Sequence, residues 1–139
     1  MLDKAISIAA QAFEEKYDKG GQPYILHCLY VMNQMPEQHD LRCVAVLHDI
    51  IEDTDWAEFD LREEGFPDHV VDAVVILTKR NDQSYDDYIK EVSKNYYAKQ
   101  VKLADLKHNS DITRMKGIEI KDMARLEKYF KAYKYLIDN

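Results

Sequence analysis

The chain has 139 residues, of which 46% are hydrophobic and 32% charged, and its formal net charge is -7 at pH 7. This length suits one domain with a sizeable core, and the acidic charge argues against general nucleic-acid binding, which relies on a basic surface. No apolar run approaches the 18 residues that a membrane span needs, and the N-terminus lacks the basic start of a secretory signal. We therefore predict a single domain over residues 1–139 in the cytoplasm, with no membrane and no duplex nucleic acid as partner.

Hydrophobic residues recur with helical spacing along almost the whole chain, and glycine and proline separate the helical segments. Ser84 is a candidate N-cap, and Pro67 is expected at the start of a helix whose β-branched residues also permit a strand, although no partner strand is evident. We predict an all-α bundle of six or seven helices. In chain order, the expected helical segments are 2–17, 24–34, 40–53, 67–79, 84–95, 98–112 and 119–137.

A histidine and several carboxylates directly follow the apolar residues of the third segment, within VAVLHDIIEDTDW. Side chains three and four apart share a face of a helix, so a continuous helix would bring His48, Asp49, Glu52 and Asp53 to one patch. Carboxylates that are desolvated together repel one another unless a cation neutralises them. Adjacent His and Asp side chains offer one nitrogen and one oxygen ligand, which suits Mn, Fe, Co or Zn.

Two other segments place a polar residue inside an apolar helix. PYILHCLYV carries His27, and VKLADLKHNSD carries Asp105, where a lone carboxylate would be costly. Together with His48 and Asp49, these residues would form a site of two histidines and two aspartates. Glu52 and Asp53, one turn further on, are candidates to orient and deprotonate an attacking water.

Each of these residues also has a purely structural interpretation. A lone buried histidine such as His27 is more often a hydrogen-bonded core residue, Asp105 is also a candidate helix cap, and the acidic run after the third segment resembles a solvated helix end. His39 and His69 are expected on the surface, and His108 either supports a ligand or is simply exposed. The metal-site hypothesis fails only if all these structural interpretations hold at once, so we favour the metal site.

PYILH, LHDIIEDT, LTK and VKLADLKHN, in this order, resemble the HD superfamily of metal-dependent phosphohydrolases. Within it, the chain is most similar to the hydrolase domain of the RelA/SpoT alarmone enzymes and their small single-domain relatives, over about residues 5–115. The resemblance implies an all-α fold with one bound Mn²⁺, while the ligand types leave Fe²⁺, Co²⁺ and Zn²⁺ open. The implied metal ligands are His27, His48, Asp49 and Asp105, the implied water-activating pair is Glu52 and Asp53, and the implied nucleotide contact is Asn109.

The chain departs from the family pattern where the substrate is expected. Asp18 stands where the family has an arginine against the nucleobase, and Leu106 and Asp111 stand at two further arginine positions, while Lys19 is retained. Fewer arginines mean fewer stacked and bidentate contacts, which lysine does not fully replace. The substrate contacts that we expect are Asp18, Lys19, Lys79, Lys107, Asn109 and Arg114.

The leading hypothesis is a metal-dependent phosphohydrolase acting on a small anionic nucleotide, most specifically the 3′-pyrophosphohydrolase of ppGpp. A nucleotide 5′- or 2′-monophosphatase, including one that acts on NADPH, keeps the chemistry and changes the substrate. A catalytically inactive nucleotide-binding or partner-binding protein is the third alternative, against which the presence of both Glu52 and Asp53 argues. The sequence leaves open whether the chain is a monomer or a homodimer. The only cysteines, Cys28 and Cys43, lie in apolar segments and are expected to be buried and reduced.

Overall fold

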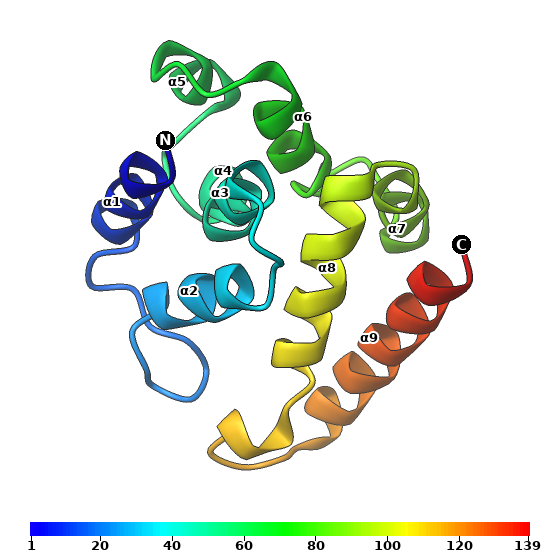
Figure 1. Cartoon of the computed structure of the whole chain (residues 1–139). Coiled ribbons are helices and arrows are strands. Elements are labelled where there is room, and N and C mark those ends of the chain that lie inside the picture. The colour runs from blue at the N-terminus through cyan, green and yellow to red at the C-terminus, as the bar shows by residue number, and fades with distance from the viewer.

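A computed structural model describes residues 1–139 and contains helices but no strands (Figure 1), so the predicted all-α class is confirmed. No helix has the combination of length and apolar character that crossing a membrane requires. The elements are α1 Leu2–Ala12, α2 Ile25–Asn33, α3 His39–Leu47, α4 Ile50–Asp53, α5 Glu58–Glu63, α6 Asp68–Ile76, α7 Tyr85–Ser93, α8 Tyr96–Asn109, the 3-10 helix η1 Ile112–Arg114, and α9 Ile120–Asp138.

Helix α3 is the centre of the molecule. Leu41 and every residue from Cys43 to Leu47 are fully buried, and α3 packs against α1, α2, α6 and α8. A helical segment that is apolar on all sides, as Cys43 to Leu47 is, must be surrounded by other elements. Helix α3 therefore lies in the core, and the polar residues that follow Leu47 lie inside the molecule.

The helix that we predicted over residues 40–53 is interrupted after Leu47. His48 and Asp49 form a turn between α3 and α4. The ring nitrogen Nδ1 of His48 lies 2.6 Å from the carbonyl oxygen of Ala45, which also accepts the backbone N–H of His48 at 3.4 Å. These contacts occupy the carbonyl that a regular helix would offer to Asp49, and side chains that bond local carbonyls commonly interrupt a helix in this way. Asp49 is therefore the N-cap residue of α4, one turn before Asp53, whose backbone N–H bonds its carbonyl at 3.0 Å.

The structure has nine α-helices where six or seven were predicted, and the surplus consists of short elements. One is α4, which the interruption separates from α3, and the other is α5, where the Asp60 carboxylate accepts the backbone N–H of Ala57 at 2.9 Å. Helix α1 also ends at Ala12 instead of residue 17, because the chain turns at Glu15 with φ 62°. The remaining helices agree with the prediction to within a few residues, and Ser84 caps α7 as expected.

Helix α9 runs along one edge of the bundle (Figure 1) and packs against α7 and α8. Its buried residues are Asp122, Ala132 and Leu136. The segment that precedes it, from Ser110 through η1, loops under the C-terminal end of α8. This arrangement places the first half of α9 opposite the loop between α1 and α2.

Candidate metal centre and substrate pocket

The four predicted metal ligands converge inside the bundle from three separate elements. His27 lies on α2, His48 and Asp49 form the turn after α3, and Asp105 lies on α8. One ligand atom from each lies within 4.8 Å of the others. The Asp105 Oδ1 atom is 2.9 Å from His27 Nε2 and 3.3 Å from His48 Nε2, and Asp49 Oδ2 is 3.0 Å from His48 Nε2. His27, His48 and Asp105 are each at most 3% exposed, so this cluster is not a solvated surface patch.

Hydrogen bonds on the far side of each imidazole ring orient its Nε2 atom toward the cluster. The carbonyl of Ala45 can only accept, so His48 Nδ1 must donate to it, and Nε2 is the nitrogen that faces the cluster. His27 Nδ1 lies 2.8 Å from Nδ1 of His108. Burial, together with the nearby Arg114 guanidinium, lowers the pKa of His108 to about 4. A neutral His108 can accept a hydrogen bond from the Nδ1–H of His27. The Nε2 atom of His27 is then available as a ligand atom.

Asp105 is held in its ionised form by a buried lysine. Burial opposes its charge, but the Lys102 ammonium and the two histidines outweigh this effect and keep the pKa of Asp105 well below its usual range. Lys102 Nζ donates to Oδ2 of Asp105 at 3.0 Å, and the Asn109 amide donates to Oδ1 at 3.0 Å. Lys102 was not among the residues that the sequence pattern indicated for the site. The sequence feature that could have indicated this role is the spacing of Lys102, which lies three residues before Asp105 and therefore on the same face of the helix.

The charge of the cluster favours a cation. Burial opposes ionisation of both His48 and Asp49, but their proximity raises the pKa of His48 and lowers the pKa of Asp49. Two buried carboxylates that face two imidazole nitrogens form a donor set of hard oxygen and borderline nitrogen, which suits divalent transition metals. The residues therefore fit a divalent metal, and His108, Lys102 and Asn109 supply the outer contacts that such sites usually have.

The acidic pair on α4 lies next to this cluster without joining it. Burial raises the pKa of Glu52, whose Oε1 accepts the backbone N–H of Lys79 at 3.0 Å. Partial burial, reinforced by the charges of Asp49 and Glu52, raises the pKa of Asp53 to about 6. Both side chains still reach solvent. A carboxylate that titrates close to neutral pH is suited to accepting a proton from water.

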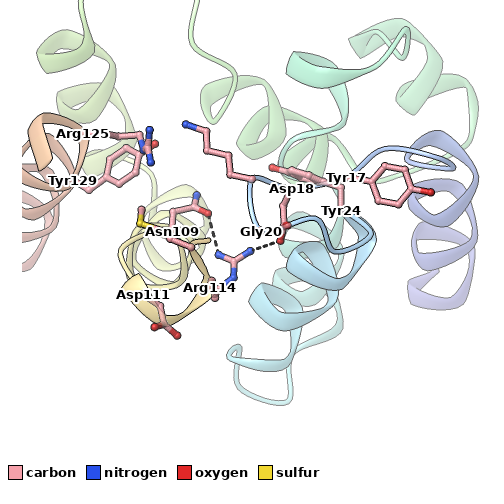
Figure 2. Close-up of a pocket in the computed structure, with 11 residues that line it drawn as sticks. Tyr17, Asp18, Gly20, Tyr24, Asn109, Asp111, Arg114, Arg125 and Tyr129 are labelled. Carbon is pink, nitrogen blue, oxygen red and sulfur yellow. Dashed lines mark hydrogen bonds and ion pairs between the residues drawn. The ribbon is translucent and has the colours of Figure 1, made fainter. Parts of the chain in front are cut away.

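A cavity of about 320 Å³ opens beside the metal cluster, between the α1–α2 loop, the end of α8 with η1, and α9 (Figure 2). Two of its lining residues reach the cluster directly. The Tyr24 hydroxyl donates to Oδ2 of Asp49, and the Asn109 amide donates to Asp105. The lining consists of Tyr17, Asp18, Lys19, Gly20, Tyr24, Asn109, Asp111, Arg114, Met115, Arg125 and Tyr129.

An ion pair ties the α1–α2 loop to η1 across one side of this cavity (Figure 2). Arg114 Nη2 lies 2.9 Å from Asp18 Oδ2, while its Nη1 donates to the carbonyl of His108 at 2.9 Å. The loop approaches closely at Gly20, where a Cβ atom would collide with the carbonyl oxygen of Arg114. The loop thus offers an acidic residue that fixes a guanidinium supplied by another segment.

The cavity gathers four of the six predicted substrate contacts, namely Asp18, Lys19, Asn109 and Arg114. The other two lie elsewhere. The Lys79 ammonium bonds the carbonyl of Arg80, and the exposed Lys107 borders a different groove between α8 and α9. At the two further positions where arginine was expected, Leu106 is buried in the core and Asp111 caps η1 by accepting from Thr113.

Sequence reasoning missed the contribution of α9 to this cavity. Arg125 and Tyr129 line it from the side opposite to the α1–α2 loop. The amphipathic pattern of residues 119–137 indicated that α9 has a buried face, but it carried no signal for which loop that face would meet. His39 and His69 are exposed, as expected, and His108 lies behind His27.

Comparison with known proteins matches residues 24–129 to the HD domain. A guanosine-3′,5′-bis(diphosphate) 3′-pyrophosphohydrolase of Haemophilus influenzae is 32% identical over 115 residues, which are 73% of this chain and 17% of that protein. The enzyme of the same name from Borreliella burgdorferi is 31% identical over 120 residues, which are 76% of this chain and 18% of that protein. The chain therefore spans less than a fifth of the length of these curated relatives.

One solved structure covers nearly the whole chain. It is described as a metazoan ortholog of SpoT that hydrolyses ppGpp and plays a role in starvation responses. The two structures align with a TM-score of 0.78 over 99% of this chain and 83% of that chain, at 24% sequence identity. At this level of identity the likeness establishes a shared fold.

Proposed function

Because the chain belongs to the HD-domain family, we propose that it is a metal-dependent phosphohydrolase acting on a nucleotide, and most specifically that it removes the 3′-pyrophosphate of ppGpp. One observation carries this proposal. Tyr24 and Asn109 each line the cavity and each hydrogen-bond one of the clustered aspartates. A molecule that enters the cavity is thereby placed against the metal ligands.

We propose that His27, His48, Asp49 and Asp105 hold one divalent metal per chain, with Mn²⁺ favoured and Fe²⁺, Co²⁺ or Zn²⁺ compatible with the same donors. A bound divalent cation supplies Lewis-acid polarisation of a phosphate and lowers the pKa of water. The protein contributes the fixed orientation of the ligands, through the bonds that Ala45, His108 and Lys102 make to them.

The cavity wall supplies charge and aromatic surface for a nucleotide. Arg114 and Lys19 lie on the loop side and Arg125 on the α9 side, so that cations from both walls face an anionic substrate although the chain as a whole is acidic. Tyr129 and Tyr24 offer aromatic faces for the base. Arginine in particular suits bidentate phosphate contacts.

In the proposed reaction, water attacks the phosphorus of the group to be removed, and the bond between that phosphorus and the 3′ oxygen of the sugar breaks. Above pH 6 Asp53 is ionised in the metal-free protein, so it can accept the proton of the attacking water. Glu52, fixed by the Lys79 N–H, orients that water. The 3′ oxygen leaves with a proton from solvent, and the products are GDP and pyrophosphate.

A nucleotide monophosphatase is the second candidate, and one observation favours it. Leu106 is 1% exposed within the core, and the charge at residue 18 is reversed, so the cavity has fewer guanidinium groups than the ppGpp pattern leads one to expect. A substrate with one phosphate at the reacting position needs fewer such contacts. We further propose a cytoplasmic location, which the free, buried thiols of Cys28 and Cys43 support.

The test is phosphate release by the Mn²⁺-loaded protein over ppGpp, pppGpp, NADPH and nucleoside 5′-monophosphates. Pyrophosphate from ppGpp is the expected product, orthophosphate from a monophosphate would transfer the assignment to the second candidate, and binding without release would overturn the enzymatic proposal. Asp49→Ala should lose both turnover and the single bound metal. Asp55→Ala, which removes a nearby carboxylate outside the cluster, should keep both.

A further inference from the structure

The apolar surface of α9 is wider than its neighbours cover. Ala132 and Leu136 are buried against the bundle, yet Met123, Phe130 and Ile137 are 62%, 64% and 53% exposed. These three side chains are spaced seven residues apart and therefore lie in one line along the helix. Large apolar residues that gather on one exposed face mark an interaction surface more often than singly exposed ones do.

The line continues as a full heptad pattern. Leu126 and Tyr133 follow Met123 and Phe130 by three residues, which gives alternating steps of three and four over residues 123–137. Apolar residues with this spacing form the seam through which two helices pack side by side. In α9 this seam borders a groove of about 590 Å³ between α8 and α9, whose lining includes Leu126, Phe130, Tyr133 and Ile112.

The charged residues beside the seam favour a second copy of α9 as its partner. On one side, the flanking positions of the heptad are Tyr129 and Leu136, which face the chain's own bundle. On the other side they are Glu127 and Lys134, both exposed, and Glu127 has only a surface pair with Lys131 at 3.1 Å. Two copies of α9 in antiparallel contact would bring the exposed flanks together and place Glu127 of each copy opposite Lys134 of the other.

We propose that the chain forms a two-fold symmetric homodimer through antiparallel packing of α9 against α9 of a second copy. In this register Phe130 packs against Tyr133 of the other copy and Leu126 against its Ile137, and each contact occurs twice, as a two-fold interface requires. A parallel arrangement would set the exposed flank of one helix against the flank that faces the partner's own bundle, so it would leave Glu127 and Lys134 without opposite charges.

The size of the surface suits this partner. Helix α9 has 19 residues and is thus about 28 Å long. A standard interface buries about 800 Å² on each partner, and a buried aromatic side chain contributes about 150–250 Å² of that. The apolar positions of the seam extend over residues 123–137 of this helix, beside the groove, and are Met123, Leu126, Phe130, Tyr133 and Ile137.

Sedimentation equilibrium over a range of protein concentrations tests the proposal. The wild-type chain should have twice the 16.4 kDa mass of one copy, and Phe130→Glu should have the mass of a monomer while keeping its helical circular dichroism. The matched control is Phe59→Glu, because Phe59 is 68% exposed on α5, away from the seam. It should remain a dimer. A monomeric wild type at about 100 μM, or a dimeric Phe130→Glu variant, would overturn the proposal.

A charge exchange tests the antiparallel arrangement separately. Glu127→Lys and Lys134→Glu should each weaken the dimer by about tenfold, because each sets like charges against each other at both ends of the seam. The double variant restores opposite charges and should return the dissociation constant to near the wild-type value. Double-variant affinity no better than that of the single variants would rule out this register.

Discussion

The metal cluster and the wall of the neighbouring cavity are built in opposite ways. The proposed ligands lie within packed helices or in the turn that follows one, and bonds to neighbours fix their donor atoms, as with His48 through Ala45 and Asp105 through Lys102. The cavity wall is made of a loop, a 3-10 turn and an edge helix, and its main cross-link is the pair of Asp18 with Arg114. Changes on the wall, apart from Tyr24 and Asn109, which bond the cluster, should therefore alter the substrate while the chemistry of the cluster stays intact.

The acidic pair lies next to the metal cluster, and its replacement should give the largest effect short of removing a proposed ligand. Glu52→Gln and Asp53→Asn should each lower turnover by about 10² to 10⁴, because an amide cannot accept a proton from water. Metal content should stay at about one per chain, since neither carboxylate is part of the ligand cluster. Turnover at saturating substrate, with metal analysis of the same samples, is the measurement. Near-native turnover in the double variant would remove the pair from the mechanism.

Replacing His108 should weaken metal binding at the cluster without unfolding the protein. His108→Phe keeps the stacking on Tyr30 but removes the nitrogen that faces His27 Nδ1. Loss of such an outer contact typically weakens metal binding about 10- to 100-fold. Titration of the metal-free protein with Mn²⁺ measures this change. His69→Phe, at an exposed position on α6, is the control, and equal metal affinity in the two variants would mean that His108 does not orient His27.

The cavity wall should respond in substrate affinity alone. Asp18→Asn keeps the size of the side chain but removes the charge that holds Arg114. A partly exposed ion pair contributes about 1 kcal/mol, so we expect KM to rise roughly threefold to tenfold with kcat and metal content unchanged. Asp111→Asn, on the same rim but bonded to Thr113, should leave KM unchanged. A fall in kcat instead would show that the wall and the cluster are not separate.

The smallest effect should appear in the stability of the metal-free protein. The pKa of Asp53 is about 6 in the folded protein, against an ordinary value of 3.8 for an aspartate. The folded state then binds more protons than the unfolded state between these values, so the Asp53 contribution makes stability fall as pH rises from about 4 to about 6. Asp53→Asn should remove this loss and stabilise the metal-free protein at pH 7.5 by on the order of 1 kcal/mol or less, given the exposure of the side chain. Urea unfolding of both proteins at pH 4 and pH 7.5 measures the difference, which should be present only at the higher pH.

The proposed ligands were accessible to sequence reasoning because each is a polar residue within or directly after an apolar helical run, where burial without a partner is costly. His27 and Asp105 stand out in this way even though 78 residues separate them. The turn at His48 and Asp49 was not predictable, because it depends on a contact between the His48 ring and the Ala45 carbonyl. A continuous helix has the same hydrophobic pattern.

The cavity was only half predictable for a related reason. Resemblance to a family locates residues near the motifs, which is how Lys19, Asn109 and Arg114 were found. Arg125 and Tyr129 belong to a helix whose pattern fixes a buried face but not its orientation relative to the α1–α2 loop. The pairing of Asp18 with Arg114 likewise joins positions 96 residues apart, and no local rule connects them.

The hydroxyl of Tyr24 belongs to the cavity wall, but it bonds Oδ2 of Asp49, an oxygen of the ligand cluster. In the proposed function, a nucleotide that moves this side chain also changes the affinity of the cluster for a cation. Thermodynamic reciprocity then requires the cation to change the affinity for that nucleotide by the same factor. Cation and nucleotide are therefore linked ligands, and the dissociation constant of either one has a definite value only at a stated concentration of the other.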